Sequence, residues 1–392
     1  MNRQLHLAGS PRFSRLWQSG LSLVELMVSV TIGLVILAAM VALFVNTSGS
    51  NRDMARANSM IENGRLAIEL LESDVSHAGF WGAYVPAYDD QTSSAVPLDA
   101  PTAVPDPCLT YNPTNWNAAY KTNLIGIPVQ AYDAASVCTG VITNLQANTD
   151  VLVVRHVETC VPGETPANPN CEADVSGKLY FQPSQCLTDV SRYVFDTSGF
   201  TLRKRGCATT ADKRKFVSSI YYIRDYAVTA GDGIPTLMRS QFDLVSGTLA
   251  HQAPVAMIEG IQGFRVEFGI DSRSKAYTGQ PTGTPVNYST AVNWLDPGTR
   301  TTTTNRGDGA PDGTFIHCTT GTPCTAAQLV NATAARIYVL VRSRDTSPGY
   351  TDTKTYTLGS AAALGPFNDG FKRHVFVTTV RLTNISGRRE TP

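Results

Sequence analysis

The chain has 392 residues, with 32 basic and 32 acidic side chains and a formal net charge of zero. A neutral chain excludes a strong overall attraction to nucleic acid or to anionic lipid. Only 16% of the residues are charged, and 31 glycines and 22 prolines supply many turns, which favours an exported β-rich domain with long loops over a cytosolic enzyme.

The first predicted element is an apolar helix over residues 21–45. Residues 26–45 carry no charge and would form about 30 Å of helix, the thickness of the hydrocarbon core of a bilayer. Three arginines and no acidic residue precede the helix, at Arg3, Arg12 and Arg15. We therefore expect the N-terminus in the cytoplasm and the C-terminal part of the chain across the membrane.

One carboxylate, Glu25, stands just before this span, where a charge needs a partner. A small pair, Ser19 and Gly20, precedes the apolar run, whereas a secretory signal peptide has small residues after it. The stretch 20–27 resembles the leader-peptidase site of type IV prepilins and type II secretion pseudopilins. The resemblance implies cleavage after Gly20, N-methylation of Leu21 and a role for Glu25 in assembly. Leu21 stands where the family usually has Phe.

Burial of Glu25 in a filament core has a physical rationale. Pairing of its carboxylate with the free amine of Leu21 on a neighbouring subunit would offset the burial of charge and set the axial register. The alternative is a simple signal-anchor helix in which Glu25 lies incidentally at the membrane interface. Such a protein would keep its leader, residues 1–20.

Residues 46–51 are weak helix formers and predict a flexible joint. Beyond the joint, spacings of three and four predict an amphipathic continuation of the helix, so that the helical region covers 46–78. The segment 62–84 also resembles the corresponding part of PilW-type minor pilins. We expect an apolar stripe to pack on the globular domain, and it comprises Met54, Ala57, Ile61, Gly64, Ile68, Leu71 and Val75.

Residues 79–392 are expected to form a periplasmic β-rich domain. Its first part, 86–128, predicts long loops, and its segment 271–334, rich in Thr, Gly and Pro, predicts an exposed insertion. Alternating or β-branched runs predict strands at 151–157, 179–181, 193–195, 217–223, 236–239, 242–245, 264–268, 337–341 and 375–382. The expected fold is α+β and pilin-like, with a long N-terminal membrane-spanning helix packed on an antiparallel sheet domain with disulfide-pinned loops.

All eight cysteines follow the apolar helix, and an even number on the exported side predicts disulfides. The sequence leaves the connectivity open. Short loop closure favours sequential pairing, namely Cys108–Cys138, Cys160–Cys171, Cys186–Cys207 and Cys318–Cys324. Zinc is the competing interpretation, but the sequence has no CxxC, and His156 and His317 lack a second ligand pair at finger-like spacing.

Two other motifs can be interpreted either as ligand-binding sites or as ordinary solvent-exposed loops. Asp308 and Asp312 stand beside turn glycines but miss the EF-hand spacing, so a solvated turn is favoured over calcium. The basic runs 203–205 and 213–215 suggest a DNA-binding patch, but a solvated loop or a contact with an acidic subunit is favoured, and we expect no nucleic acid partner. Because GxSxG, P-loop and HExxH motifs are missing, we expect neither catalysis nor a cofactor.

Three later segments, 231–239, 257–271 and 373–389, resemble segments of PilW-type minor pilins and, more distantly, of J-type pseudopilins. The resemblance implies a minor pilin that the leader peptidase processes and that residues 21–45 hold in the inner membrane. With other minor pilins, the major pilin and the inner-membrane assembly machinery, it would prime polymerisation at the pilus tip and present an adhesin. The sequence leaves open which pilus behaviours, namely adhesion, twitching motility or DNA uptake, depend on it. The alternatives are a J-type pseudopilin of type II secretion and an anchored periplasmic binding module.

Overall fold

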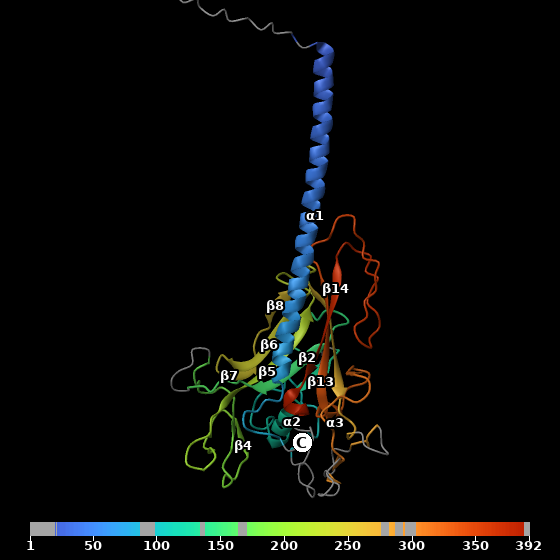
Figure 1. The fold of residues 1–392 in the computed structure, drawn as a ribbon. Helices are drawn as coiled ribbons and strands as arrows, with labels where there is room; N and C mark the ends of the chain where they lie inside the picture. The colour runs from blue at the N-terminus through green and yellow to red at the C-terminus, as the bar shows by residue number, and fades with distance from the viewer. Residues whose placement is uncertain are drawn as a thin grey trace, which may run out of the picture. The chain divides into compact units, whose positions relative to one another are not determined.

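The computed structural model describes residues 20, 22–86, 99–133, 138–163, 171–275, 282–286, 293–294 and 303–387. The chain forms two compact units, Met1–Ala55 and Arg56–Pro392. The long helix α1 (Leu23–His77) contributes residues to both units, and the strands all belong to the second unit (Figure 1).

Helix α1 is continuous over its 55 residues. The flexible joint predicted at 46–51 is therefore wrong, because these residues are helical. Each weak helix former there opposes the helix by only a few tenths of a kcal/mol up to about 1 for Gly49. Extending an existing helix across them is easier than starting a new helix beyond them, because nucleation is the unfavourable step.

The part of α1 in the second unit buries one face. Its buried residues are Met60, Gly64, Ala67, Leu71 and Val75. The predicted stripe is wrong at two positions, because Met54 is 56% and Ile61 is 37% exposed. The close contact at Gly64 helps to explain which face turns inward: a Cβ there would lie 2.1 Å from Cε2 of Phe376, so only glycine lets this ring approach the helix.

One antiparallel sheet has eight strands in the second unit. Its main path runs β1-β2-β5-β3-β4, and β6 joins through β5 and also pairs with β7 and β8. These strands are β1 (Val129–Tyr132), β2 (Val151–Val157), β3 (Tyr180–Pro183), β4 (Tyr193–Asp196), β5 (Arg214–Arg224), β6 (Thr236–Val245), β7 (Thr248–His251) and β8 (Val255–Glu259). The two runs predicted at 236–239 and 242–245 form the single strand β6.

A second antiparallel sheet has the order β12-β9-β13-β14. Its strands are β9 (Ile261–Ile270), β12 (Ile316–His317), β13 (Ala332–Arg342) and β14 (Arg373–Arg381). The short strands β10 (Asn293–Trp294) and β11 (Thr303–Thr304) pair with each other, and α3 (Ala326–Leu329) and α4 (Thr383–Ser386) flank β13 and β14 in sequence. The predicted α+β class, with a long N-terminal helix and antiparallel sheets, is confirmed.

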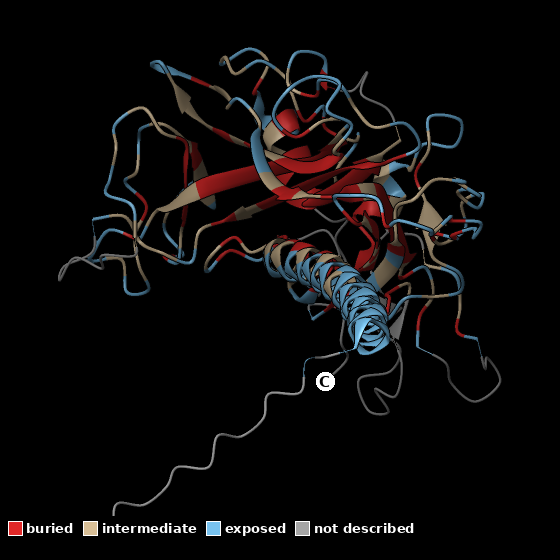
Figure 2. Ribbon diagram, turned by 90° about the horizontal axis from the view of Figure 1, so that it is seen from above, coloured by how far each residue is buried: buried red, intermediate tan, exposed pale blue. Residues whose placement is uncertain are grey.

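The main hydrophobic core joins α1 to both sheets. Leu71 and Val75 of α1 share it with Leu152 of β2, Val266 of β9 and Val339 of β13. These three strands are largely buried, and Figure 2 shows buried strands in the interior of the second unit. Each such side chain contributes about 1.5–3 kcal/mol by leaving water, so the helix and the two sheets stabilise one another.

A second, aromatic cluster surrounds the helix α2 (Ala118–Gly126). Asn117 caps this helix, because its side chain accepts a hydrogen bond from the backbone N–H of Tyr120 at 2.9 Å. The loops predicted over 86–128 are therefore wrong for residues 118–126. The cluster includes Trp81, Trp116, Phe181, Phe195, Phe216 and Phe242.

The segment 271–334 is only partly an exposed insertion. Cys318, Leu329 and Ala332 lie in the main core, and β13 begins at Ala332. The predicted exposure is therefore wrong for the C-terminal part, where β12 brings the chain back to the sheet by pairing with β9. Residues 276–281, 287–292 and 295–302 of the segment lie outside the described residues.

Four disulfides fasten the loops of the second unit. They close chain segments of different length, with sequence separations from 6 to 30 residues. No cysteine is free. The pairs are Cys108–Cys138, Cys160–Cys171, Cys186–Cys207 and Cys318–Cys324, which is the sequential order.

Candidate functional site

The N-terminal end of α1 holds the predicted processing and assembly residues. Gly20 precedes the helix, and Leu21 lies outside the described residues. Ser22 and Glu25 form reciprocal hydrogen bonds: the backbone N–H of Ser22 donates to Oε2 of Glu25 at 2.9 Å, and the N–H of Glu25 donates to Oγ of Ser22 at 3.2 Å. This is a capping box, which starts the helix directly after the predicted cleavage point.

The geometry leaves part of the Glu25 carboxylate available. Oε2 accepts the Ser22 N–H, and the described residues supply no partner to Oε1. The bond to Ser22 also survives cleavage after Gly20, because Ser22 stays on the mature chain. A neighbouring ammonium group can therefore approach the carboxylate without breaking the cap.

The apolar part of α1 exposes its side chains. Large apolar residues between Leu23 and Val45 are 50–76% exposed, and Figure 2 shows this part of the helix in the colour of exposed residues. In the described part of the chain, α1 is the one helix long and apolar enough to cross a membrane. So large an exposed apolar surface needs lipid or other helices around it.

A polar network fastens the other end of α1 inside the second unit. Asp74 of α1 accepts hydrogen bonds from two strands: its Oδ1 lies 2.9 Å from Nε2 of His156 on β2, and its Oδ2 accepts the hydroxyl of Tyr221 on β5 at 2.9 Å. Next to Asp74, the fully buried Val75 packs into the core. The network therefore holds the last turns of the helix against the eight-stranded sheet.

Burial and charge oppose each other in this network. Burial alone would raise the pKa of Asp74, but the hydrogen bond and the charge of His156, with the bond from Tyr221, outweigh it and lower the pKa. Burial alone would lower the pKa of His156, but its hydrogen bond to Asp74 and the carboxylate charge raise it above 6.5. Asp74 and His156 thus stabilise each other's charged forms.

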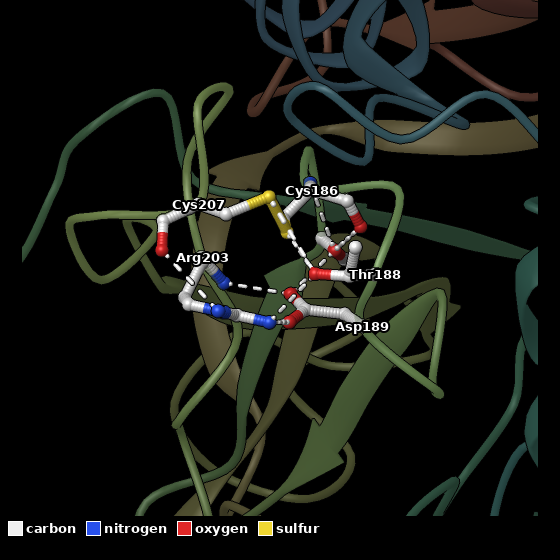
Figure 3. Close-up of a disulfide and its surroundings, with 6 residues drawn as sticks. Cys186, Thr188, Asp189, Arg203 and Cys207 are labelled. Carbon is white, nitrogen blue, oxygen red and sulfur yellow. Dashed lines mark hydrogen bonds and ion pairs between the residues drawn. A yellow bond between two sulfur atoms is a disulfide. The ribbon is translucent and has the colours of Figure 1, made fainter.

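The predicted basic patch is paired within the chain. Arg203 Nε donates to Oδ1 of Asp189 at 2.8 Å, and its Nη1 donates to the carbonyl of Cys207 at 3.2 Å. Figure 3 shows the guanidinium and this carboxylate facing each other beside the Cys186–Cys207 disulfide. Lys204 also pairs with a carboxylate, that of Asp212, at 2.8 Å.

Both lysines of the second basic run are neutralised in the same way. Lys215 Nζ lies 2.7 Å from Glu172 and 3.0 Å from Asp243, and Lys213 pairs with Asp174 at 2.8 Å. Burial opposes the charge of Lys215, but these carboxylates outweigh it and raise its pKa. Four of the six cations of the two runs thus have a carboxylate partner, whereas Arg214 bonds backbone carbonyls and Arg205 is exposed. The pairing reduces the charge that is left for a phosphate backbone.

The possible metal ligands serve structural hydrogen bonds. Asp312 accepts the backbone N–H groups of Ser272 and Arg273 at 2.8 and 2.7 Å, and Asp308 accepts that of Ala310 at 3.0 Å. His317 lies 3.0 Å from Oδ2 of the buried Asp150. No cluster of three His, Cys, Asp or Glu side chains suitable for a metal ion occurs within the described ranges.

Sequence reasoning missed both the capping box at Ser22 and Glu25 and the polar network that holds Asp74 of α1, which we call the helix anchor. The cap was readable, because Ser22 and Glu25 have the spacing of a capping box. The anchor had a weaker signal: Asp74 stands three residues after Leu71, on the inward side of an amphipathic helix, where an acidic residue needs a partner. Nothing in the sequence identifies His156 and Tyr221 as that partner, because the strands that carry them are far along the chain.

One comparison with known proteins, the match to a family model, agrees with the resemblance seen in the sequence. Residues 220–384, from within β5 to α4, match the family model of PilW, described as type IV pilus-assembly protein W. Among solved structures, a type IV-like pilin from Thermus thermophilus matches with 12% identity and a TM-score of 0.24, over 61% of this chain and 79% of that chain. The comparison with curated proteins finds no match. The predicted PilW-type resemblance is confirmed over the matched residues.

Proposed function

With residues 220–384 matched to the PilW family, we propose that this chain is a minor pilin of a type IV pilus. The leader is cut after Gly20, residues 21–45 anchor the chain in the inner membrane, and the same helix later enters the filament. The observation that supports the proposal most directly is the combination of this family match with a capped helix that begins at a prepilin-like site and exposes its apolar side chains between Leu23 and Val45.

The proposed role is assembly and needs no catalytic site. Within a bundle of apolar helices, the Glu25 carboxylate pairs with the methylated amine of Leu21 on a neighbouring subunit. An uncompensated buried charge is strongly unfavourable, so only subunits in the correct axial register are retained. With other minor pilins, the chain occupies the pilus tip, primes polymerisation of the major pilin and carries an adhesin.

The bulk of the second unit supports a place at the tip. It spans 337 residues, Arg56–Pro392, which is large for a subunit that repeats along a shaft. The alternative role is a J-type pseudopilin at the tip of a type II secretion pseudopilus, which uses the same N-terminal helix. Co-purification with pilus subunits or with secretion components distinguishes these two roles.

Substitution of Glu25 tests the assembly role. Glu25→Leu should leave the chain in the inner membrane but reduce its recovery in sheared filaments about tenfold or more, because loss of the ion pair removes about 1–3 kcal/mol of register-dependent binding. Glu25→Asp is the matched control, since it keeps the charge and should assemble better. Equal recovery of wild type and Glu25→Leu would contradict the proposal.

A further inference from the structure

Strand β14 ends the four-stranded sheet, and the described residues place no strand beyond it. All nine residues of β14, 373–381, pair with 334–342 of β13, and the sheet order stops at β14. In an antiparallel pair, alternate residues turn their N–H and C=O groups to the outer edge. These outward groups of β14 can therefore pair with another strand.

The middle of this edge lacks the features that usually protect a sheet edge, and the basic residues Arg373, His374 and Arg381 stand only near its ends. The strand at the opposite end of the sheet, β12, has two residues, whereas β14 has nine, with no proline or glycine. Its central residues 375–380 carry no charge, and Val377 is 52% exposed. Natural sheets normally shorten, charge or cover such an edge. We therefore expect that another chain covers β14 in the working assembly.

A pocket of about 380 Å³ lies between β14 and α1, which Figure 1 shows near each other. Its apolar lining comes from Ile68 of α1 and from Phe376 and Val377 of β14. The inner edge of β14 is bonded to β13, so the pocket and the unpaired outer edge belong to the same strand.

The rim of this pocket is acidic. Glu69 and Glu72 of α1 line it and are exposed. Glu72 accepts a long hydrogen bond from Thr378 at 3.5 Å, but among the described residues no ion pair links either carboxylate to a cation. One basic residue, Arg65, also lines the pocket, which leaves an excess of negative charge beside an apolar floor.

We propose that β14 and this pocket are the docking site for an extended strand of a neighbouring subunit. The strand adds to the sheet by backbone hydrogen bonds, places an apolar side chain between Ile68 and Phe376, and sets a Lys or Arg beside Glu69 and Glu72. Backbone pairing supplies the affinity, and the pocket with its acidic rim supplies the selectivity. The origin of the strand in another pilus subunit rests on the proposed function, whereas the edge and the pocket do not.

A synthetic peptide tests the site on the full-length chain in detergent. The probe is a labelled nine-residue peptide of alternating valine and threonine with a lysine at each end, and binding is followed by fluorescence anisotropy. A second peptide has glutamates in place of the lysines, and a third has a central proline. Both changes should weaken binding about tenfold, because they reverse the charge match or remove a strand hydrogen bond. Equal binding of the three peptides would overturn the proposal.

Charge variants of the helix connect the binding to this pocket. Glu72→Lys should weaken binding of the lysine peptide about fivefold and strengthen binding of the glutamate peptide. Glu62→Lys is the matched control, because it makes the same charge change on an exposed position of the same helix. Along the helix axis it lies about 10 Å from Glu69 and about 15 Å from Glu72, beyond the Debye length at physiological salt. If the two variants had the same effect, the binding would not be at this pocket.

Proline variants of β14 provide a test that does not depend on charge. Neighbouring residues of a strand turn their N–H groups to opposite edges. One of the two variants Val377→Pro and Thr378→Pro therefore removes a hydrogen bond to β13, and the other removes an N–H group only from the free edge. Thermal unfolding identifies the variant that keeps its stability. That variant should lose peptide binding, and full binding by it would overturn the proposal.

The outcomes separate this inference from the proposed function. Peptide binding as expected, in a chain that never enters a filament, would refute the pilus role and leave the docking edge. Normal filaments from a folded variant that binds no peptide would refute the docking edge and leave the pilus role. Concentration-dependent dimers that the same proline variant abolishes would instead assign the edge to a second copy of this chain.

Discussion

Replacing His156 by Gln should remove a pH-dependent part of the anchoring of α1. In the wild type, His156 lies 2.9 Å from Asp74, and both side chains are largely buried, at 12% and 16% exposure. A glutamine amide can donate a hydrogen bond to the same carboxylate but does not titrate. The comparison therefore isolates the charge of His156 from its shape.

The sign follows from the pKa shift of His156. Its pKa is raised above the unfolded value of 6.5, so its contribution to stability is fully present below pH 6.5 and is lost as the pH rises through the folded-state pKa. The pKa of Asp74 is lowered from 3.8, so Asp74 stays ionised between pH 5 and 8 and its own contribution is constant there. The stability advantage of the wild type over the variant should therefore be largest at pH 5.

The magnitude follows from the hydrogen bond. A bond to a charged group contributes about 1.5–3 kcal/mol and a neutral one about 0.5–1.5 kcal/mol. The difference in unfolding free energy between wild type and His156→Gln should therefore be about 1 kcal/mol larger at pH 5 than at pH 8. Tyr221 and Glu158 also face this pair, and both are present in the wild type and in the variant.

Urea unfolding of the full chain in a mild detergent measures this difference, with tryptophan fluorescence as the signal because Trp81 and Trp116 are buried. His77→Gln is the matched control: the His77 ring lies 5.8 Å from that of His156 but bonds the carbonyl of Ser73 on its own helix. The control should keep the wild-type pH dependence. A difference for His156→Gln that is constant with pH, or larger at pH 8, would refute the reasoning.

Three further predictions concern packing, buried charge and DNA. Gly64→Ala should destabilise the chain by about 1 kcal/mol. Displacing the Phe376 ring costs about 1–3 kcal/mol, whereas the higher helix propensity of alanine stabilises the helix by about 1 kcal/mol. In a Phe376→Ala background the same substitution should stabilise the chain, as measured by denaturant unfolding. Asp352→Leu should lower the melting temperature and reduce the unfolding free energy by about 3 kcal/mol, because it removes a partner of the fully buried Arg373. Adding Arg373→Met should restore part of the lost stability. Arg203→Glu should leave any salt-dependent gel shift of DNA unchanged, and a clear loss of binding would revive the DNA interpretation.

The sequence predicted the elements whose signal is local. The strand at 151–157 matches β2 at both ends, because six of its seven residues are buried and five of the seven are apolar and branched at the β or γ carbon. The apolar helix was predicted for the same reason, since its length and lack of charge are visible without any partner. The cysteine pairs close short loops, so their sequential order could be suggested from chain distance alone.

The failures are places where a distant partner decides the structure. The face of α1 that turns inward depends on the contact between Gly64 and Phe376, which stand more than 300 residues apart in the chain. Leu329 and Ala332 were assigned to an exposed insertion because the segment 271–334 as a whole is rich in Thr, Gly and Pro, yet both residues are buried. The edge of β14 likewise becomes visible only when the strand order is known.

The mass of the N-terminal peptide tests the central claim most directly. The peptide would be isolated from sheared filaments and from membranes of cells with and without the leader peptidase. The proposed function predicts a methylated N-terminus at Leu21 in both fractions when the peptidase is present, and full-length chain confined to membranes when it is missing. An unprocessed Met1 terminus in both strains would contradict a prepilin and leave an anchored periplasmic protein.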